Sequence, residues 1–186
     1  MILATVLLDP PSTLLFGTAI AVVSMKLIRA NPAAALKKTV AITAAWSAWY
    51  GVCVGWFFFM RPDWMLTYLV DSSKVPLVPA FLVFWAALVG YGVVGALGTG
   101  LLVQQNKTGL AIGTVGVSAA FFGLLLFMSN PAYVKVGTFA QYFAGTAPGI
   151  EADPAMQTAM TVSGIGIGLG VVASLVAQFV MKPKAA

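Results

Sequence analysis

The chain has 186 residues, of which 60% are hydrophobic and only 8% are charged, and its formal net charge is +5. A soluble domain carries about a quarter charged residues because its surface faces water, so this composition excludes an ordinary soluble domain. The basic residues are scattered between apolar segments, which argues against nucleic acid as a partner. Together with a mean hydropathy of +0.96, these features predict an all-α membrane protein with a single transmembrane domain over residues 1–186.

Five segments are predicted to span the membrane, since a spanning helix needs about 20 mostly apolar residues. The first covers about 12–28 and follows Pro10 and Pro11. Prolines are tolerated at the start of a helix, where their missing N–H would have no partner, so we expect the helix to begin there. The second span covers about 39–60 and is rich in aromatic residues.

The third span covers about 76–103 and is followed by the polar residues 104–107, which predict a tight turn. The fourth covers about 108–128. The fifth, about 154–181, begins with a proline directly after an aspartate, which is typical of a helix cap followed by the first helical residue. The chain is therefore predicted to form a bundle of about five transmembrane helices.

Two longer connections, 62–71 and 131–145, are rich in aromatic residues. Aromatic rings favour the depth of the lipid headgroups, so both connections are interpreted as short interfacial helices on the outer side of the membrane. Ordinary loops with a few anchoring aromatic residues are the alternative.

The distribution of charge between the connections predicts the orientation. One side receives seven basic residues and no acidic residue, namely Lys26, Arg29, Lys37, Lys38, Lys107, Lys182 and Lys184. The other side receives three basic and five acidic residues, namely Arg61, Lys74, Lys135, Asp9, Asp63, Asp71, Glu151 and Asp153. Because cytoplasmic loops carry the excess of lysine and arginine, we expect the N-terminus outside and the C-terminus in the cytoplasm, in a prokaryotic cytoplasmic (inner) membrane.

Missing residue types exclude several kinds of chemistry. The chain has no histidine and a single cysteine, Cys53, which removes histidine-ligated haem, most copper and zinc sites, and protein-ligated iron–sulfur clusters. Pathways for protons and sodium ions usually require an acidic residue within the membrane, and no acidic residue lies within a predicted span. We therefore predict no metal, no catalytic residue and no cofactor, and we expect bound lipid.

Glycines are concentrated in the last three spans, where spacings of four residues indicate close helix packing. The predicted packing residues are Gly90, Gly92, Gly95, Gly98, Gly109, Gly113, Gly164, Gly166, Gly168 and Gly170. Such faces pack either within one chain or against another subunit or copy, and the sequence leaves both readings open.

An aromatic stripe follows one side of the second span. It consists of Trp46, Trp49, Tyr50, Trp56 and Phe57. The stripe could stack against a flat apolar ligand such as a quinone or a pigment. Core packing and a lipid-facing surface are the alternatives.

A polar cluster is predicted on the outer face. It consists of Arg61, Asp63, Asp71, Lys74, Glu151 and Asp153. Paired carboxylates at the membrane boundary could serve an enzyme that acts on lipid, and alanine at the three aspartates would test that hypothesis. Helix capping and pairing with lipid phosphate are the alternatives.

These features favour a non-catalytic integral membrane subunit of a larger complex, which provides helix-packing surfaces and an outer docking face for other subunits or copies of itself. Two alternatives stay open. One is a small transporter or oligomeric channel, for which the nearest polar stripe is Thr39, Thr43 and Ser47. The other is the membrane-boundary enzyme.

Overall fold

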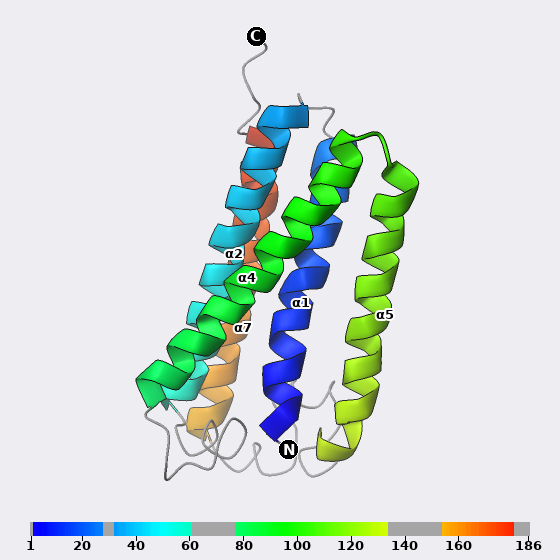
Figure 1. Ribbon diagram of the computed structural model, residues 1–186. Coiled ribbons are helices and arrows are strands. Elements are labelled where there is room, and N and C mark those ends of the chain that lie inside the picture. Colours follow the sequence, from blue (N-terminus) through cyan, green and yellow to red (C-terminus); the bar gives the residue numbers. More distant parts are fainter. Residues whose placement is uncertain (1, 28–31, 61–76, 134–153, 181–186) are drawn as a thin grey trace.

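The computed structural model describes residues 2–27, 32–60, 77–133 and 154–180, and within these ranges nearly every residue is helical. The helices are α1 (Ile2–Val22), which continues as a π-helical turn η1 (Val23–Leu27), α2 (Pro32–Met60), α4 (Leu77–Gln104), α5 (Thr108–Tyr133) and α7 (Pro154–Val180). Successive helices run in opposite directions and form one elongated bundle (Figure 1). The all-helical fold class is thereby confirmed for the described residues.

Three helix boundaries differ from the expectation. Helix α2 begins at Pro32, seven residues before the predicted second span. Helix α1 begins at Ile2, so Pro10 and Pro11 lie inside the helix and the predicted start at these prolines is wrong. Helix α5 continues through Pro131 to Tyr133, beyond the predicted end of the fourth span. A proline removes one hydrogen bond and crowds one turn, whereas the flanking apolar residues favour helix on both sides. Proline therefore marks a helix boundary less reliably here than in a soluble chain.

The predicted turn between the third and fourth spans is present. Asn106 adopts a left-handed conformation with φ of 59°, which asparagine tolerates better than most residues. The backbone N–H of Lys107 donates to the carbonyl of Leu102 at 2.8 Å, which satisfies one of the free carbonyls at the end of α4. Helix α5 starts directly afterwards, so α4 and α5 are antiparallel neighbours.

Two helical stretches in the described part of the chain are long and apolar enough to cross a membrane, Phe81–Gln104 in α4 and Thr161–Gln178 in α7. The core helix of a soluble protein can pass the same test, but such a helix is mostly buried, whereas only 28% and 11% of these windows are buried. Pro11–Lys26 and Thr108–Leu124 are shorter apolar helices. The two long stretches point to membrane association.

The backbones of α1 and α4 approach each other closely. A Cβ atom built at Gly17 would collide with the carbonyl oxygen of Gly92 and lie 3.0 Å from the backbone nitrogen of Ala96. One built at Gly95 would lie 2.7 Å from the carbonyl oxygen of Leu14. The hydroxyl of Thr13 donates to the carbonyl of Leu88 across the same contact at 2.7 Å. The missing side chains thus allow the two backbones to meet.

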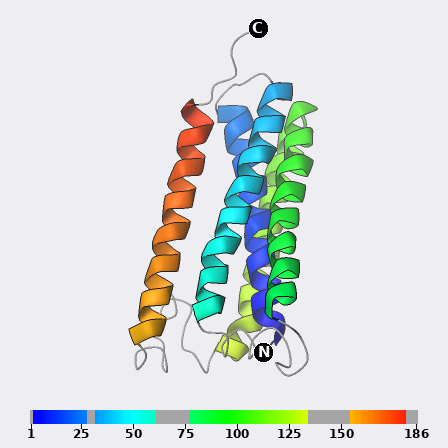
Figure 2. The same cartoon turned by 90° about the vertical axis from the view of Figure 1, so that its left-hand side faces the viewer.

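The other helices are arranged around this pair. Helix α2 packs on α4, α5 packs mainly on α1, and α7 packs mainly on α2 at the edge of the bundle. Figure 2 shows α7 standing beside α2, on the far side from α1 and α4. The edge position leaves much of α7 exposed.

The bundle buries small polar side chains and exposes large apolar ones. Val83, Val117, Leu169 and Val180 are between 63% and 75% exposed. The fully buried side chains include four hydroxyl residues, namely Thr13, Thr39, Thr43 and Ser47. An apolar outer surface of this extent is unfavourable in water, whereas in lipid helix association depends on small and polar contacts instead.

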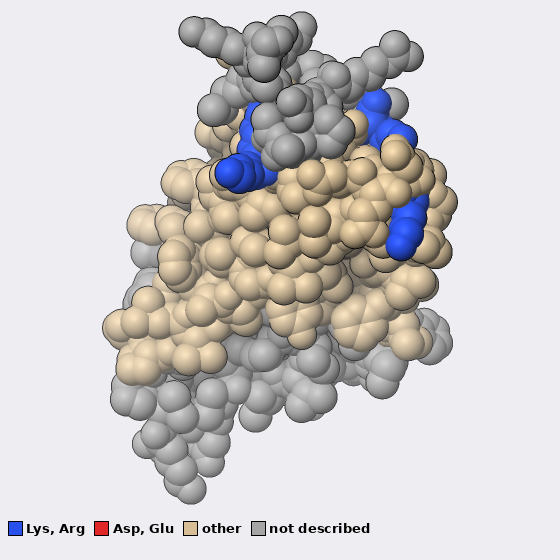
Figure 3. All heavy atoms as spheres, turned by 45° about the horizontal axis from the view of Figure 1, so that its top comes forward, with Lys and Arg blue, Asp and Glu red and all other residues tan. Residues whose placement is uncertain are grey.

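The described basic residues gather at one end of the bundle. Lys26 lies in the last turn of η1, Lys37 and Lys38 lie near the start of α2, and Lys107 precedes α5. These four lysines lie at the same end because the helices alternate in direction, and Figure 3 shows the lysines around that end. The fold therefore keeps the described basic residues together.

Candidate functional site

The interface between α2 and α7 is formed by aromatic and glycine residues and by hydrogen bonds that join the two helices. The indole N–H of Trp49 donates to the carbonyl of Gly166 at 2.7 Å, and its ring lies over Gly170, where a Cβ atom would be 2.5 Å from Trp49 Cδ1. The hydroxyl of Ser163 donates to the carbonyl of Cys53 at 3.0 Å. Each bond ties a side chain of one helix to the backbone of the other, which fixes the register of α7.

Lys38 joins α2 to α7 at the end of the bundle where the lysines gather. Its ammonium group donates to the carbonyl oxygen of Gln178 at 2.7 Å. That carbonyl lies in the last turn of α7, where carbonyls lack helical partners and the helix dipole favours a cation. Desolvation by burial lowers the pKa of Lys38 from its usual value. The contact both caps α7 and attaches it to α2.

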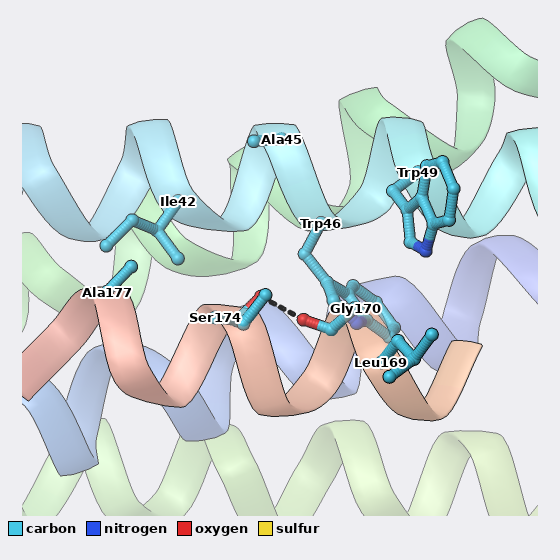
Figure 4. A pocket seen from close by; sticks show the side chains of 9 residues that line it. Ile42, Ala45, Trp46, Trp49, Leu169, Gly170, Ser174 and Ala177 are labelled. Carbon is cyan, nitrogen blue, oxygen red and sulfur yellow. Dashed lines mark hydrogen bonds between the residues drawn. The ribbon is translucent and has the colours of Figure 1, made fainter. Parts of the chain in front are cut away.

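A cavity of about 350 Å³ lies between these two helices (Figure 4). Its lining is almost entirely apolar and is drawn from α2 and α7, namely Ile42, Ala45, Trp46, Trp49, Leu169, Gly170, Ala173, Ser174 and Ala177. We call it the α2–α7 cleft. The hydroxyl of Ser174 donates to the carbonyl of Gly170 in its own helix at 2.8 Å, as the dashed line shows. Its proton is therefore not available to a ligand in the cleft.

Trp46 is the most buried aromatic side chain of the cleft, with 7% of its surface exposed. The rings of Phe16 and Tyr50 stack on its indole, with centroid distances of 3.7 and 5.3 Å. The indole Nε1 is buried and has no hydrogen-bond partner. Its neighbour Cδ1 lies 3.6 Å from the position of a Cβ at Gly170, so this edge of the ring is turned toward the α7 side of the cleft.

A second group of polar atoms without partners lies where α2 packs against α4. Thr39, Thr43 and Ser47 are fully buried, and their hydroxyl oxygens have no hydrogen-bond partner. A Cβ at Gly92 would touch the hydroxyl of Ser47 and lie 3.4 Å from Thr43 Cγ2, so this stripe faces α4. The stripe is packed against a neighbouring helix.

A larger groove of about 620 Å³ opens between α4 and α5, with α1 behind it. Its glycines Gly98 and Gly113 have open space where a Cβ would stand. The hydroxyls of Thr99 and Thr114 lie 3.2 Å apart, and Thr114 donates to the carbonyl of Ala111, so Thr99 is the donor between the two. We call this surface the α4–α5 groove.

The predicted packing glycines fall into two groups. Gly92, Gly95, Gly166 and Gly170 lie against another helix of this chain. The others have nothing within 4 Å of a Cβ position, namely Gly90, Gly98, Gly109, Gly113, Gly164 and Gly168. The spacing pattern predicts a small-residue face without telling which side of the helix the rest of the chain covers.

The structure brings together only part of the aromatic stripe. Trp46 and Trp49 line the cleft, Tyr50 is half-buried against Trp46, and Trp56 is 47% exposed. The side chain of Phe57 lies outside the described residues, as do all members of the outer polar cluster, namely Arg61, Asp63, Asp71, Lys74, Glu151 and Asp153. Of the two connections expected to be interfacial helices, 62–71 and residues 134–145 also lie outside the described residues, whereas residues 131–133 form the end of α5. An active site on the outer face stays a prediction. Among the described residues, no group of acidic, histidine or cysteine side chains could hold a metal ion.

Sequence reasoning missed three glycines that the packing requires. Gly17 forms the contact with α4, Gly51 accommodates the ring of Trp85, and Gly55 accommodates the ring of Phe81. Trp85 also donates its indole N–H to the carbonyl of Ala48 at 3.0 Å. The spacing of four between Gly51 and Gly55 is the signal that could have found two of them.

Comparisons of the chain with protein-family models, with curated proteins and with solved structures found no match. The functional argument therefore depends on the geometry described above.

Proposed function

We propose that the chain is a multi-pass membrane protein with five spanning helices, the N-terminus outside and the C-terminus in the cytoplasm of a prokaryotic cell. The exposed valine and leucine side chains and the buried hydroxyl groups support this placement. The lysines at one end of the bundle agree with an excess of positive charge on the cytoplasmic side.

The topology predicts opposite labelling of two cysteines. With Cys53 replaced by serine, Ser73→Cys is expected to react with a membrane-impermeant maleimide added outside intact cells, because residue 73 lies in an outer connection of the proposed topology. Gln105→Cys, in the turn after α4, is expected to react only after the cells are opened. Labelling of both positions from the same side would contradict the five-span topology.

For the role of the protein, we propose a non-catalytic subunit of a larger membrane complex. The α4–α5 groove carries this proposal. A groove of about 620 Å³ with open glycines on both walls is shaped to receive a helix, because small residues let a second backbone approach closely.

If a partner helix binds in the α4–α5 groove, a large side chain placed there is expected to weaken the association with partner subunits. Gly113→Leu places a side chain in the groove and is expected to weaken the association with stoichiometric partners about fivefold to a hundredfold, as overpacking of about 1–3 kcal/mol implies. Gly123→Leu, also exposed on α5 but outside the groove, is the matched control and is expected to retain them. Native mass determination in mild detergent measures both. A monomeric wild-type protein without partners would contradict the subunit proposal.

A small transporter or oligomeric channel is the second candidate. The observation that favours it is the stripe of buried hydroxyls without partners on α2, formed by Thr39, Thr43 and Ser47. Unpaired polar groups are costly inside a membrane bundle and are often found near paths for polar solutes. In the native mass experiment, a homo-oligomer without other subunits would favour this candidate over the subunit.

A further inference from the structure

We infer that the α2–α7 cleft binds a membrane-dissolved apolar molecule that carries a carbonyl oxygen, such as a quinone, and that Trp46 donates its indole N–H to that oxygen. The inference rests on the membrane placement proposed above and is independent of the groove between α4 and α5. Neither the helix-packing role nor the channel role requires it.

The lining of the cleft determines the general character of the ligand. Alanine and glycine residues leave the volume of about 350 Å³, and Trp49, Ile42 and Leu169 supply apolar walls. Figure 4 shows these side chains lying between the two helices. Ser174 offers no free proton, since its hydroxyl donates within α7. The bound part of the ligand is therefore mainly apolar.

The indole N–H of Trp46 determines the polar feature of the ligand. A buried donor without a partner costs about 1–3 kcal/mol, and a tryptophan nitrogen can only donate, so the missing partner must be an acceptor. Phe16 and Tyr50 already stack on the indole ring. The ligand is thus recognised at the N–H edge of the ring, and the carbonyl oxygen of a lipophilic ketone or quinone fits that requirement.

The depth of Trp46 in the membrane favours such a ligand over an ordinary phospholipid. Trp46 lies seven residues inside the proposed span that starts at residue 39, which is about 10 Å at 1.5 Å per residue. The hydrocarbon core is about 30 Å thick, and phospholipid ester carbonyls lie at its boundary. A phospholipid that places an acyl chain in the cleft therefore leaves the N–H unpaired, whereas a molecule that moves within the hydrocarbon can reach it.

Access to the N–H requires a small movement, because neighbouring atoms cover the nitrogen in this structure. Leu169 is the lining side chain best suited to move, since it is 63% exposed and lies beside the Trp46 ring in Figure 4. A change of its rotamer opens the cleft toward the bilayer without moving either backbone.

The inference can be tested with the full chain in nanodiscs of phosphatidylethanolamine and phosphatidylglycerol. A photoreactive short-chain quinone is titrated, and labelled peptides are identified by mass spectrometry. We expect saturable labelling of peptides from α2 and α7 that an unlabelled quinone competes away. Trp46→Phe, which keeps a ring but removes the donor, is expected to weaken binding about threefold to tenfold. Ala173→Leu, which fills the cleft, is expected to reduce labelling more than tenfold.

Two matched controls are available. Trp56→Phe removes an exposed indole from the same helix, and Ala119→Leu enlarges an exposed alanine on α5. Both are expected to bind as the wild type does. Labelling that is not saturable, equal affinity of wild type and Trp46→Phe, or a phospholipid that persists in the cleft and blocks labelling would overturn the inference. Failure of the chain to insert into nanodiscs would instead contradict the membrane placement on which it rests.

Discussion

Replacing Gly166 by cysteine is expected to link α7 to α2 through a disulfide with Cys53 when the protein is oxidised in detergent or lipid. A Cβ atom built at Gly166 lies 2.8 Å from Cys53 Sγ and 3.9 Å from its Cβ. Disulfides have Cβ–Cβ distances of about 3.5–4.5 Å, so the bond forms without movement of either backbone. Cys53 is a free thiol, so no other substitution is required.

The linkage is measured by counting alkylated thiols by intact mass before and after oxidation, followed by mass spectrometry of the joined peptides. Gly164→Cys and Gly168→Cys are the matched controls, because both lie two residues from Gly166 on another face of α7, with nothing within 4 Å of their Cβ positions. We expect near-complete linkage at 166 and little at the other two positions. Equal linkage at all three would show that α7 does not dock on α2 in the register described.

Enlarging Gly17 is expected to destabilise the bundle severely. Even the methyl group of alanine would collide with the carbonyl oxygen of Gly92 and approach the backbone nitrogen of Ala96 to 3.0 Å. Both atoms belong to the backbone of α4, which cannot give way as a flexible side chain can. Overpacking typically costs about 1–3 kcal/mol. We therefore expect Gly17→Ala to lower the free energy of unfolding by that amount and Gly17→Leu to lower it by more than about 3 kcal/mol.

Unfolding in mixed micelles with increasing SDS measures these free energies. Gly90 on α4 is the control position, because nothing lies within 4 Å of its Cβ position. Alanine is favoured over glycine in a helix by about 1 kcal/mol, so Gly90→Ala is expected to be neutral or stabilising. The same substitution therefore has opposite signs at the two glycines. A stabilising effect of Gly17→Ala would contradict the close contact between α1 and α4.

The helical character of the chain could be predicted well because it depends on properties that are local along the sequence. The third and fifth spans, predicted as about 76–103 and 154–181, agree closely with α4 and α7. The turn before α5 was also predicted, since Asn106 and its polar neighbours interrupt two apolar segments. The start of the first helix was predicted wrongly, because Pro10 and Pro11 were given more weight than the apolar residues that precede them.

The candidate site could be predicted only in part. The aromatic stripe included Trp46 and Trp49, which line the α2–α7 cleft, but helical spacing could not show that Phe16 stacks on Trp46 from a different helix. Nor could spacing show that the N–H of Trp46 is without a partner while the N–H of Trp49 has one. Whether a donor is satisfied depends on which backbone carbonyl the neighbouring helix places beside it.

The sequence by itself determined that the chain is apolar and helical and where its charges lie, because composition and hydrophobic run length act residue by residue. Only the tertiary structure decided which small residues face a partner within the chain. Gly92 and Gly113 look equivalent in the sequence. Gly92 of α4 lies against α2 on one side and against α1 on another, whereas Gly113 of α5 opens onto a groove. The reason is that a glycine marks where two backbones can approach, while the crossing of the helices selects the positions at which they do.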